Sequence, residues 1–88
     1  MASYKLVIDK RVRKKDLPSI PKLDLSRILE RIAELSHNPR PTGAEKLTNQ
    51  PGYRLRQGDY RILYLIDDAQ QIVRVAKVAH RRAVYRNQ

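Results

Sequence analysis

The chain has 88 residues, a net charge of +10 and no cysteine. This length predicts one small domain over residues 1–88, with a modest core and its chemistry on an exposed face or in a shallow groove. The 41% hydrophobic content excludes a wholly disordered chain, and the missing thiols exclude disulfides and thiolate zinc sites. The two histidines, His37 and His80, are far apart in sequence, so neither a metal site nor a cofactor is expected.

The excess of basic residues indicates a polyanionic partner, most simply nucleic acid. Basic residues gather between positions 10 and 15, and the segment from Ala69 onward has basic residues but no acidic one. A merely solvated surface or an acidic protein partner is the alternative. The apolar run from Tyr60 to Asp68 is too short to span a bilayer, and the N-terminus lacks a signal-peptide pattern. We therefore expect a cytoplasmic protein without membrane contact.

The first half of the chain predicts one strand and two helices. Alternating apolar residues indicate a strand over Tyr4–Asp9, and Asp9 could cap a short basic helix running to about Leu17. Prolines then break the chain, because the residue before a proline avoids helical geometry. The clearest element is a helix over Pro21–Ser36, whose apolar stripe at helical spacing consists of Leu25, Ile28, Leu29, Ile32 and Leu35.

After a loop over 38–43, the apolar period changes to about two residues and predicts three strands. They span Tyr53–Gln57, Tyr60–Ile66 and Gln71–Ala79, with hairpin turns at 58–59 and 67–70 and a basic tail from His80 to Arg86. The element order β-α-α-β-β-β predicts an α+β fold, in which a small antiparallel sheet packs against two N-terminal helices.

An arginine cluster carries the clearest chemical signal. Arg54 and Arg56 share one face of a strand about 7 Å apart, and a hairpin returns Arg61 opposite or diagonal to Arg56. Guanidiniums this close repel one another, and a bound phosphate relieves the repulsion. The alternative is a solvated face paired to Glu45 or Asp59. The predicted RNA-binding residues are Arg54, Arg56, Arg61, Arg74, Lys77, Arg81, Arg82 and Arg86.

Two ordered motifs point to a known family. The first extends from Tyr53 to Tyr64 around Gly-Asp-Tyr-Arg, and the second from Val78 to Tyr85 around His-Arg-Arg. With Asn38-Pro39, Lys46-Leu47 and Pro51-Gly52, they resemble RelE-type toxins of the RelE/ParE superfamily of toxin–antitoxin systems. The resemblance covers essentially the whole chain and implies a microbial-ribonuclease-like RelE fold.

The resemblance also implies a metal-independent endoribonuclease that cuts messenger RNA in the ribosomal A site and stops translation. By this resemblance Arg61 and Arg81 stabilise the charge that develops on the phosphate. Arg54 and Arg56 stand where the family often has lysines that hold the substrate, and Tyr85 orients a nucleotide or transfers a proton. Because arginine stays protonated, the general base is expected to be His80, unless that residue is structural, or Tyr85.

Two other functions remain open at this point. ParE-type toxins share the fold but poison DNA gyrase, and a basic sheet could also bind RNA or the ribosome without cutting. A toxin of this kind implies a cognate, neutralising RelB-like antitoxin that folds along the basic surface in a toxin–antitoxin hetero-oligomer. The expected partners are therefore this antitoxin, the ribosome and messenger RNA.

Overall fold

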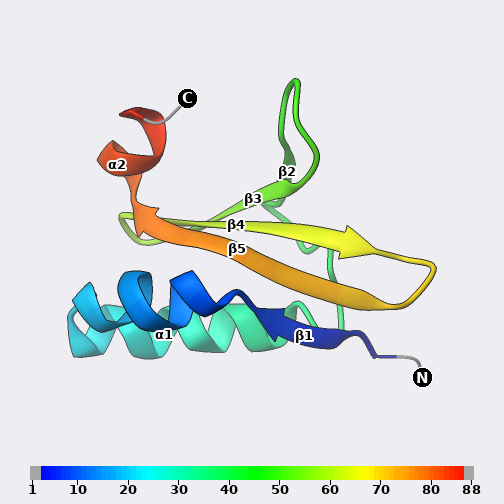
Figure 1. Ribbon diagram of the computed structural model, residues 1–88, viewed down its shortest axis with the longest axis horizontal. Coiled ribbons are helices and arrows are strands. Elements are labelled where there is room, and N and C mark those ends of the chain that lie inside the picture. Colours follow the sequence, from blue (N-terminus) through cyan, green and yellow to red (C-terminus); the bar gives the residue numbers. More distant parts are fainter. Residues whose placement is uncertain (1–2, 87–88) are drawn as a thin grey trace.

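The computed structural model describes residues 3–86, with side chains described for residues 3–83. Figure 1 shows the long helix lying along one side of the sheet and a short C-terminal helix beyond the end of the last strand. Within these residues no helix is long and apolar enough to cross a membrane. The elements in chain order are β1 (Lys5–Ile8), η1 (Val12–Asp16), η2 (Leu17–Ser19), α1 (Lys22–Glu34), β2 (Glu45–Lys46), β3 (Tyr53–Gln57), β4 (Tyr60–Asp67), β5 (Ile72–His80) and α2 (Arg81–Arg86).

The sheet has five strands in the order β1-β5-β4-β3-β2. Strands β2 to β5 pair antiparallel, whereas β1 runs parallel to β5. The α+β class, with helices packed on a sheet, is confirmed, but the expectation of a wholly antiparallel sheet is wrong at the β1 edge. Parallel neighbours need a long crossover, and the chain between β1 and β5 supplies one because it contains all the N-terminal helices and the other strands.

The predicted strands of the second half are present with small shifts. β3 has the predicted bounds, while β4 and β5 end one residue later than expected. The turn after β3 is present, and Gly58 there has a φ of +60°, a conformation that glycine adopts without steric cost. The two-residue β2 was not predicted, since two residues show no periodicity. The basic tail, left without assigned structure, begins with α2.

α1 forms on the predicted apolar stripe, but the stripe is narrower than expected. Ile28, Ile32 and Leu35 are at most 2% exposed, whereas Leu29 is 41% exposed. Each residue advances about 100° around a helix, so Leu29 is rotated away from the sheet once its neighbour Ile28 faces it. The helix begins after Pro21, which needs no amide partner there.

The predicted basic helix near residues 9–17 is present as a π-helical turn followed by a 3₁₀ turn. Val12 is fully buried, and the Asp16 carboxylate accepts a hydrogen bond of 3.0 Å from the Val78 amide. These contacts hold the segment against β5. Asp9 does not cap the helix as predicted, because its carboxylate accepts a hydrogen bond from Arg74 at 3.1 Å instead.

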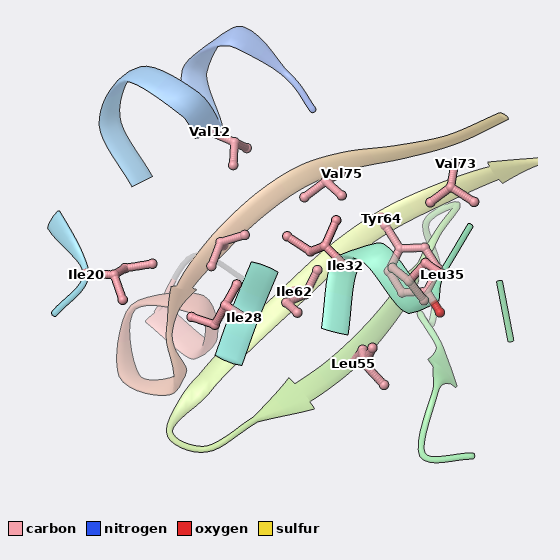
Figure 2. Close-up of a cluster of buried hydrophobic side chains, with 11 residues drawn as sticks. Val12, Ile20, Ile28, Ile32, Leu35, Leu55, Ile62, Tyr64, Val73 and Val75 are labelled. Atoms are coloured by element: carbon pink, nitrogen blue, oxygen red, sulfur yellow. The ribbon is translucent and has the colours of Figure 1, made fainter. Parts of the chain in front are cut away.

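The core lies between the helices and the sheet (Figure 2). Helices contribute aliphatic residues from one side and alternate strand residues contribute from the other. Burial of each large aliphatic side chain stabilises the fold by about 1.5–3 kcal/mol. The buried side chains are Val12, Ile20, Ile28, Ile32, Leu35, Leu55, Ile62, Tyr64, Val73, Val75 and Val78.

Tyr64 joins the core to the loop between α1 and β2. Its side chain is 1% exposed, and its hydroxyl donates a 2.7 Å hydrogen bond to the carbonyl oxygen of Pro39. Burial raises the pKa of Tyr64 to about 12. Its ring also stacks on Tyr53 at a centroid distance of 5.8 Å. The loop therefore has a fixed attachment point in the core.

A second attachment connects this loop to the hairpin turn between β4 and β5. Arg40 donates to both carboxylate oxygens of Asp68, at 3.2 and 2.8 Å, and the Tyr4 hydroxyl donates to Asp68 at 2.7 Å. The hydrogen bonds from Arg40 and Tyr4 lower the pKa of Asp68 to about 2. Arg40 also lies over the Tyr53 ring, 5.3 Å from its centroid. Three distant segments thus meet at one carboxylate.

We predict that Tyr64→Phe lowers the free energy of unfolding by about 1–3 kcal/mol, because the Pro39 carbonyl oxygen loses its buried donor. Urea denaturation at pH 7 measures the change. Tyr60→Phe is the matched control, since the Tyr60 hydroxyl has no hydrogen bond among the described residues, and it should change stability little. Equal effects of the two substitutions would contradict the role assigned to the Tyr64 hydroxyl.

Asp68→Asn is expected to lower stability at pH 7 and to make progressively less difference as pH falls through about 2. The folded-state pKa of Asp68 is depressed to about 2, so its contribution is complete above the ordinary carboxyl pKa and is lost as pH falls from about 4 to 2. Denaturation midpoints across this range test the prediction. Glu30→Gln, at an exposed residue of α1, should show no such pH dependence, and a pH-independent deficit for Asp68→Asn would refute the linkage.

Candidate nucleic-acid interface

Strand alternation places the predicted arginines on the face of the sheet opposite the core. Leu55 and Ile62 are opposed across β3 and β4 and are buried under the helices. Their neighbours Arg54, Arg56 and Arg61 therefore point to the other face. The register pairs Arg56 directly with Arg61, and side chains so opposed have Cβ atoms about 4.5–5.5 Å apart. The predicted approach of Arg56 and Arg61 is confirmed.

Arg61 is held in place although it faces away from the core. It is 5% exposed, and its Nη1 donates to the carbonyl oxygens of Tyr60 at 3.1 Å and Gly58 at 3.5 Å. Carbonyl acceptors offset part of the cost of removing a charged group from water. The guanidinium is thus fixed beside the β3–β4 turn and is largely shielded from solvent.

Arg54 and Arg56 differ in their surroundings. Arg54 Nη2 lies 3.3 Å from a carboxylate oxygen of Glu45 on β2, so the alternative reading of this arginine, a pairing with Glu45, is correct for the free protein. Arg56 is exposed and has no ion pair among the residues described. Of the two, Arg56 is therefore the guanidinium available to a phosphate without first losing a carboxylate.

β5 adds two further cations to this face, of which only Lys77 lies near the arginines of β3 and β4. Lys77 is half-buried. It pairs with Leu63 of β4, and Leu63 pairs with Arg54 of β3, so these three residues form a cross-strand row. Arg74 shares the face but stands beyond a bulge in the β4–β5 register and is paired with Asp9 at 3.1 Å. Arg74 is therefore not gathered with the other predicted residues. We call Arg54, Arg56, Arg61 and Lys77 the basic face.

The start of α2 is attached to the same turn as Arg61. The Arg81 amide donates to the carbonyl oxygen of Asp59 at 2.8 Å, next to Gly58, whose carbonyl oxygen Arg61 contacts. Figure 1 shows α2 leaving β5 beside this turn. The side chains of Arg81 and Arg82 are exposed. The predicted site residues Tyr85 and Arg86 lie in α2, but their side chains are outside the described part of the chain.

His80 supports α2 rather than joining the arginines. Its Nδ1 accepts a 3.3 Å hydrogen bond from the Arg82 amide, which satisfies a donor in the first turn of the helix. Its ring meets Tyr60 edge-on at a centroid distance of 5.5 Å. The register pairs His80 with Tyr60 and Ala79 with Arg61, so alternation directs His80 to the face opposite Arg61.

Two features of the site, the strand that carries Glu45 and the position of Arg31, were not predicted from the sequence. Glu45 lies on the short strand β2 and engages Arg54, and Arg31 of α1 lines a pocket together with Arg56. Glu45 had been named as a possible partner, but nothing in its local sequence indicates a strand. The basic cluster near residues 10–15 is exposed on the helical side, apart from the basic face.

Comparison with known proteins agrees with this architecture. A family model described as the ParE toxin of the type II toxin–antitoxin system parDE matches residues 7–85. Toxin RelE of Mycobacterium tuberculosis is 36% identical over 73 residues, covering 72% of this chain and 75% of that protein.

Two solved complexes contain chains with this fold. One chain of the RelBE2 toxin–antitoxin complex of Mycobacterium tuberculosis superposes with a TM-score of 0.79 at 28% identity, over 90% of this chain and 99% of that chain. One chain of the RelE–RelB complex of Pyrococcus horikoshii gives a TM-score of 0.76 at 30% identity, over 90% and 96%. The present chain therefore belongs to the RelE/ParE superfamily of type II toxin–antitoxin toxins, and it is of the RelE type.

Proposed function

We propose that this toxin is a metal-independent endoribonuclease that cuts messenger RNA in the ribosomal A site. The observation that carries the proposal is that the Arg61 guanidinium and the Arg81 backbone amide both contact the Gly58–Asp59 turn, with Arg56 directly across the strands from Arg61. The exposed side chain of Arg81 starts from this turn, and guanidiniums brought together here would suit a phosphodiester that gains negative charge during the reaction. The similarity to proteins named RelE supports the same activity.

In the proposed reaction the ribose 2′-oxygen forms a bond to the neighbouring phosphorus as the bond to the 5′-oxygen breaks. The 2′-hydroxyl loses its proton and the leaving 5′-oxygen gains one, so the products are a 2′,3′-cyclic phosphate and a 5′-hydroxyl end. The transition state carries more negative charge on the phosphoryl oxygens than the substrate does. Fixed cations beside those oxygens therefore lower the barrier.

The basic residues take different parts in this proposal. Arg61, nearly buried and held by carbonyl oxygens, stabilises the charge that develops on the phosphate. Arg81 joins it from the start of α2, and the exposed Arg56 captures the incoming backbone. Arg54 and Lys77 hold flanking phosphates, with Arg54 first exchanging its carboxylate partner.

We assign His80 a positioning role and keep Tyr85 as the candidate for proton transfer. His80 Nδ1 is engaged with the first turn of α2, and strand alternation turns the residue away from Arg61. A stable cap on α2 places Arg81 beside the turn and carries Tyr85 with the same helix. The imidazole would then serve the reaction through the helix and not by taking the proton.

We further propose that a RelB-like antitoxin neutralises the toxin by covering the basic face. Both solved relatives described above are complexes of a RelE-type toxin with a RelB-type partner. The net charge of +10 and the exposed Arg56, Arg81 and Arg82 favour a partner with acidic residues. Binding there would exclude RNA by occupying the same cations.

We predict that replacing Arg61 and Arg81 together by alanine abolishes cutting, since loss of one oxyanion-stabilising donor lowers kcat by about 10²–10³-fold. The measurement is primer extension on a message bound to ribosomes with purified toxin. Arg27→Ala, at an exposed residue of α1 on the helical side, is the matched control and should cut normally.

Expression of the toxin in bacteria, with growth and RNA 5′ ends followed together, separates the competing functions. The matching family carries the ParE name, so a gyrase poison is the second candidate. Growth arrest with DNA damage signalling and no new RNA ends would support that function and contradict RNA cleavage. Neither arrest nor cuts would leave a binding module without catalysis.

His80→Ala and His80→Asn distinguish a cap from a general base. Asparagine is a good helix cap whose side-chain oxygen can replace Nδ1, but it cannot accept a proton near neutral pH. We predict that His80→Asn retains most of the cutting rate and the parent pH profile, whereas His80→Ala loses activity as α2 loosens. Equal loss in both variants, with disappearance of the acidic limb of the pH profile, would instead identify His80 as the base.

A further inference from the structure

A pocket opens where β2 diverges from β3. β2 pairs with β3 only at Glu45 opposite Arg54 and Lys46 opposite Tyr53. Gly43, with a φ of +95°, then directs the chain away, so β3 from Leu55 onward has no outer neighbour among the described strands. The gap holds a pocket of about 330 Å³, within the range of roughly 300–1,000 Å³ typical of small-molecule sites. Its lining residues are Arg31, Gly43, Glu45, Leu55 and Arg56.

The lining combines several kinds of recognition group. Successive residues of an antiparallel strand direct their N–H and C=O groups to opposite edges, so either Leu55 or Arg56 presents both groups to the pocket. The Leu55 side chain is apolar and 1% exposed. Glu45 contacts Arg54 through Oε1, and the described structure gives its Oε2 no hydrogen bond. Arg31, 27% exposed, comes from α1.

These groups match a nucleobase attached to a phosphate. Guanidinium planes stack on bases, while backbone groups and carboxylates read the donors and acceptors on base edges. Arg56 lines the pocket and also faces Arg61 across the strands. A nucleotide whose phosphate contacts the exposed Arg56 can therefore place its base in the pocket that Arg56 and Glu45 both line.

A peptide strand is a weaker fit to this edge. It would use the outer backbone groups of β3, but it would not explain the two arginines, Arg31 and Arg56, that line the pocket with Glu45. The short length of the unpaired edge, Leu55 to Gln57, also limits the ladder that a peptide could form.

We propose that this pocket holds the base next to the scissile phosphate and that Glu45 selects bases with an amino group. The inference rests on the proposed RNA cleavage. A carboxylate accepts a hydrogen bond from the amino groups of cytosine and adenine, which uracil lacks. The base at this position thus becomes a determinant of where the toxin cuts.

The test measures cutting rates on ribosomes carrying messages that differ only in the bases of the A-site codon. The varied base is the one next to the cut. We expect the parent toxin to cut codons with uracil at this position more slowly than codons with cytosine there, by a factor on the order of ten. Glu45→Gln should bring the two rates together, because an amide can donate to uracil as well as accept from cytosine. A change in affinity for all messages leaves this ratio unaffected.

Glu30→Gln is the matched control, since Glu30 is an exposed carboxylate of α1 that does not line the pocket, and it should keep the parent preference. A preference that persists in Glu45→Gln would overturn the proposal. Loss of antitoxin affinity in that variant, with preference unchanged, would assign the pocket to the antitoxin.

A second measurement is independent of cutting. Titration of the isotope-labelled toxin with cytidine or uridine monophosphate should shift the Gly43 and Leu55 amide resonances, with tighter binding of the cytidine nucleotide in the parent but not in Glu45→Gln. Shifts without cutting would contradict the proposed ribonuclease and retain the pocket. Absence of shifts at these amides would contradict the pocket alone.

Discussion

The burial of two opposed aliphatic residues determines the rest of this structure. Leu55 on β3 and Ile62 on β4 face each other under the helices and are almost inaccessible to water. Because strand residues alternate, a slip of one position would bring the flanking arginines into the core and expose both aliphatic side chains. The guanidiniums are thus held together by the hydrophobic core and not by any attraction among themselves. Their mutual repulsion remains available to be relieved by an anion.

The turn between β3 and β4 converts this alternation into a local cluster. Gly58 provides the positive φ that the turn needs and a carbonyl oxygen for Arg61, while Asp59 accepts the Arg81 amide. Two arginines separated by 20 positions of sequence therefore share one short segment. His80 completes the arrangement by capping the helix that carries Arg81. Electrostatic stabilisation depends on such fixed donors, because a flexible cation must reorganise as the charge develops.

The loop between α1 and β2 positions the edge strand of the sheet. Tyr64 attaches Pro39 to the core, and Arg40 binds Asp68 in the β4–β5 turn. Both contacts lie away from the basic face, yet they fix the position at which the chain re-enters the sheet as β2. The position of Glu45, and with it the pocket beside β3, follows from contacts made elsewhere.

The sequence by itself determined the order of the elements except β2 and α2, the two C-terminal hairpins and the approach of Arg61 to Arg56, because apolar periodicity and turn chemistry are local. Its two ordered motifs also indicated the family to which the chain belongs. The tertiary structure alone decided that β1 is parallel to β5, that Glu45 reaches Arg54 and that His80 turns from Arg61 to α2. These outcomes depend on contacts between segments far apart in the chain, for which local periodicity contains no signal.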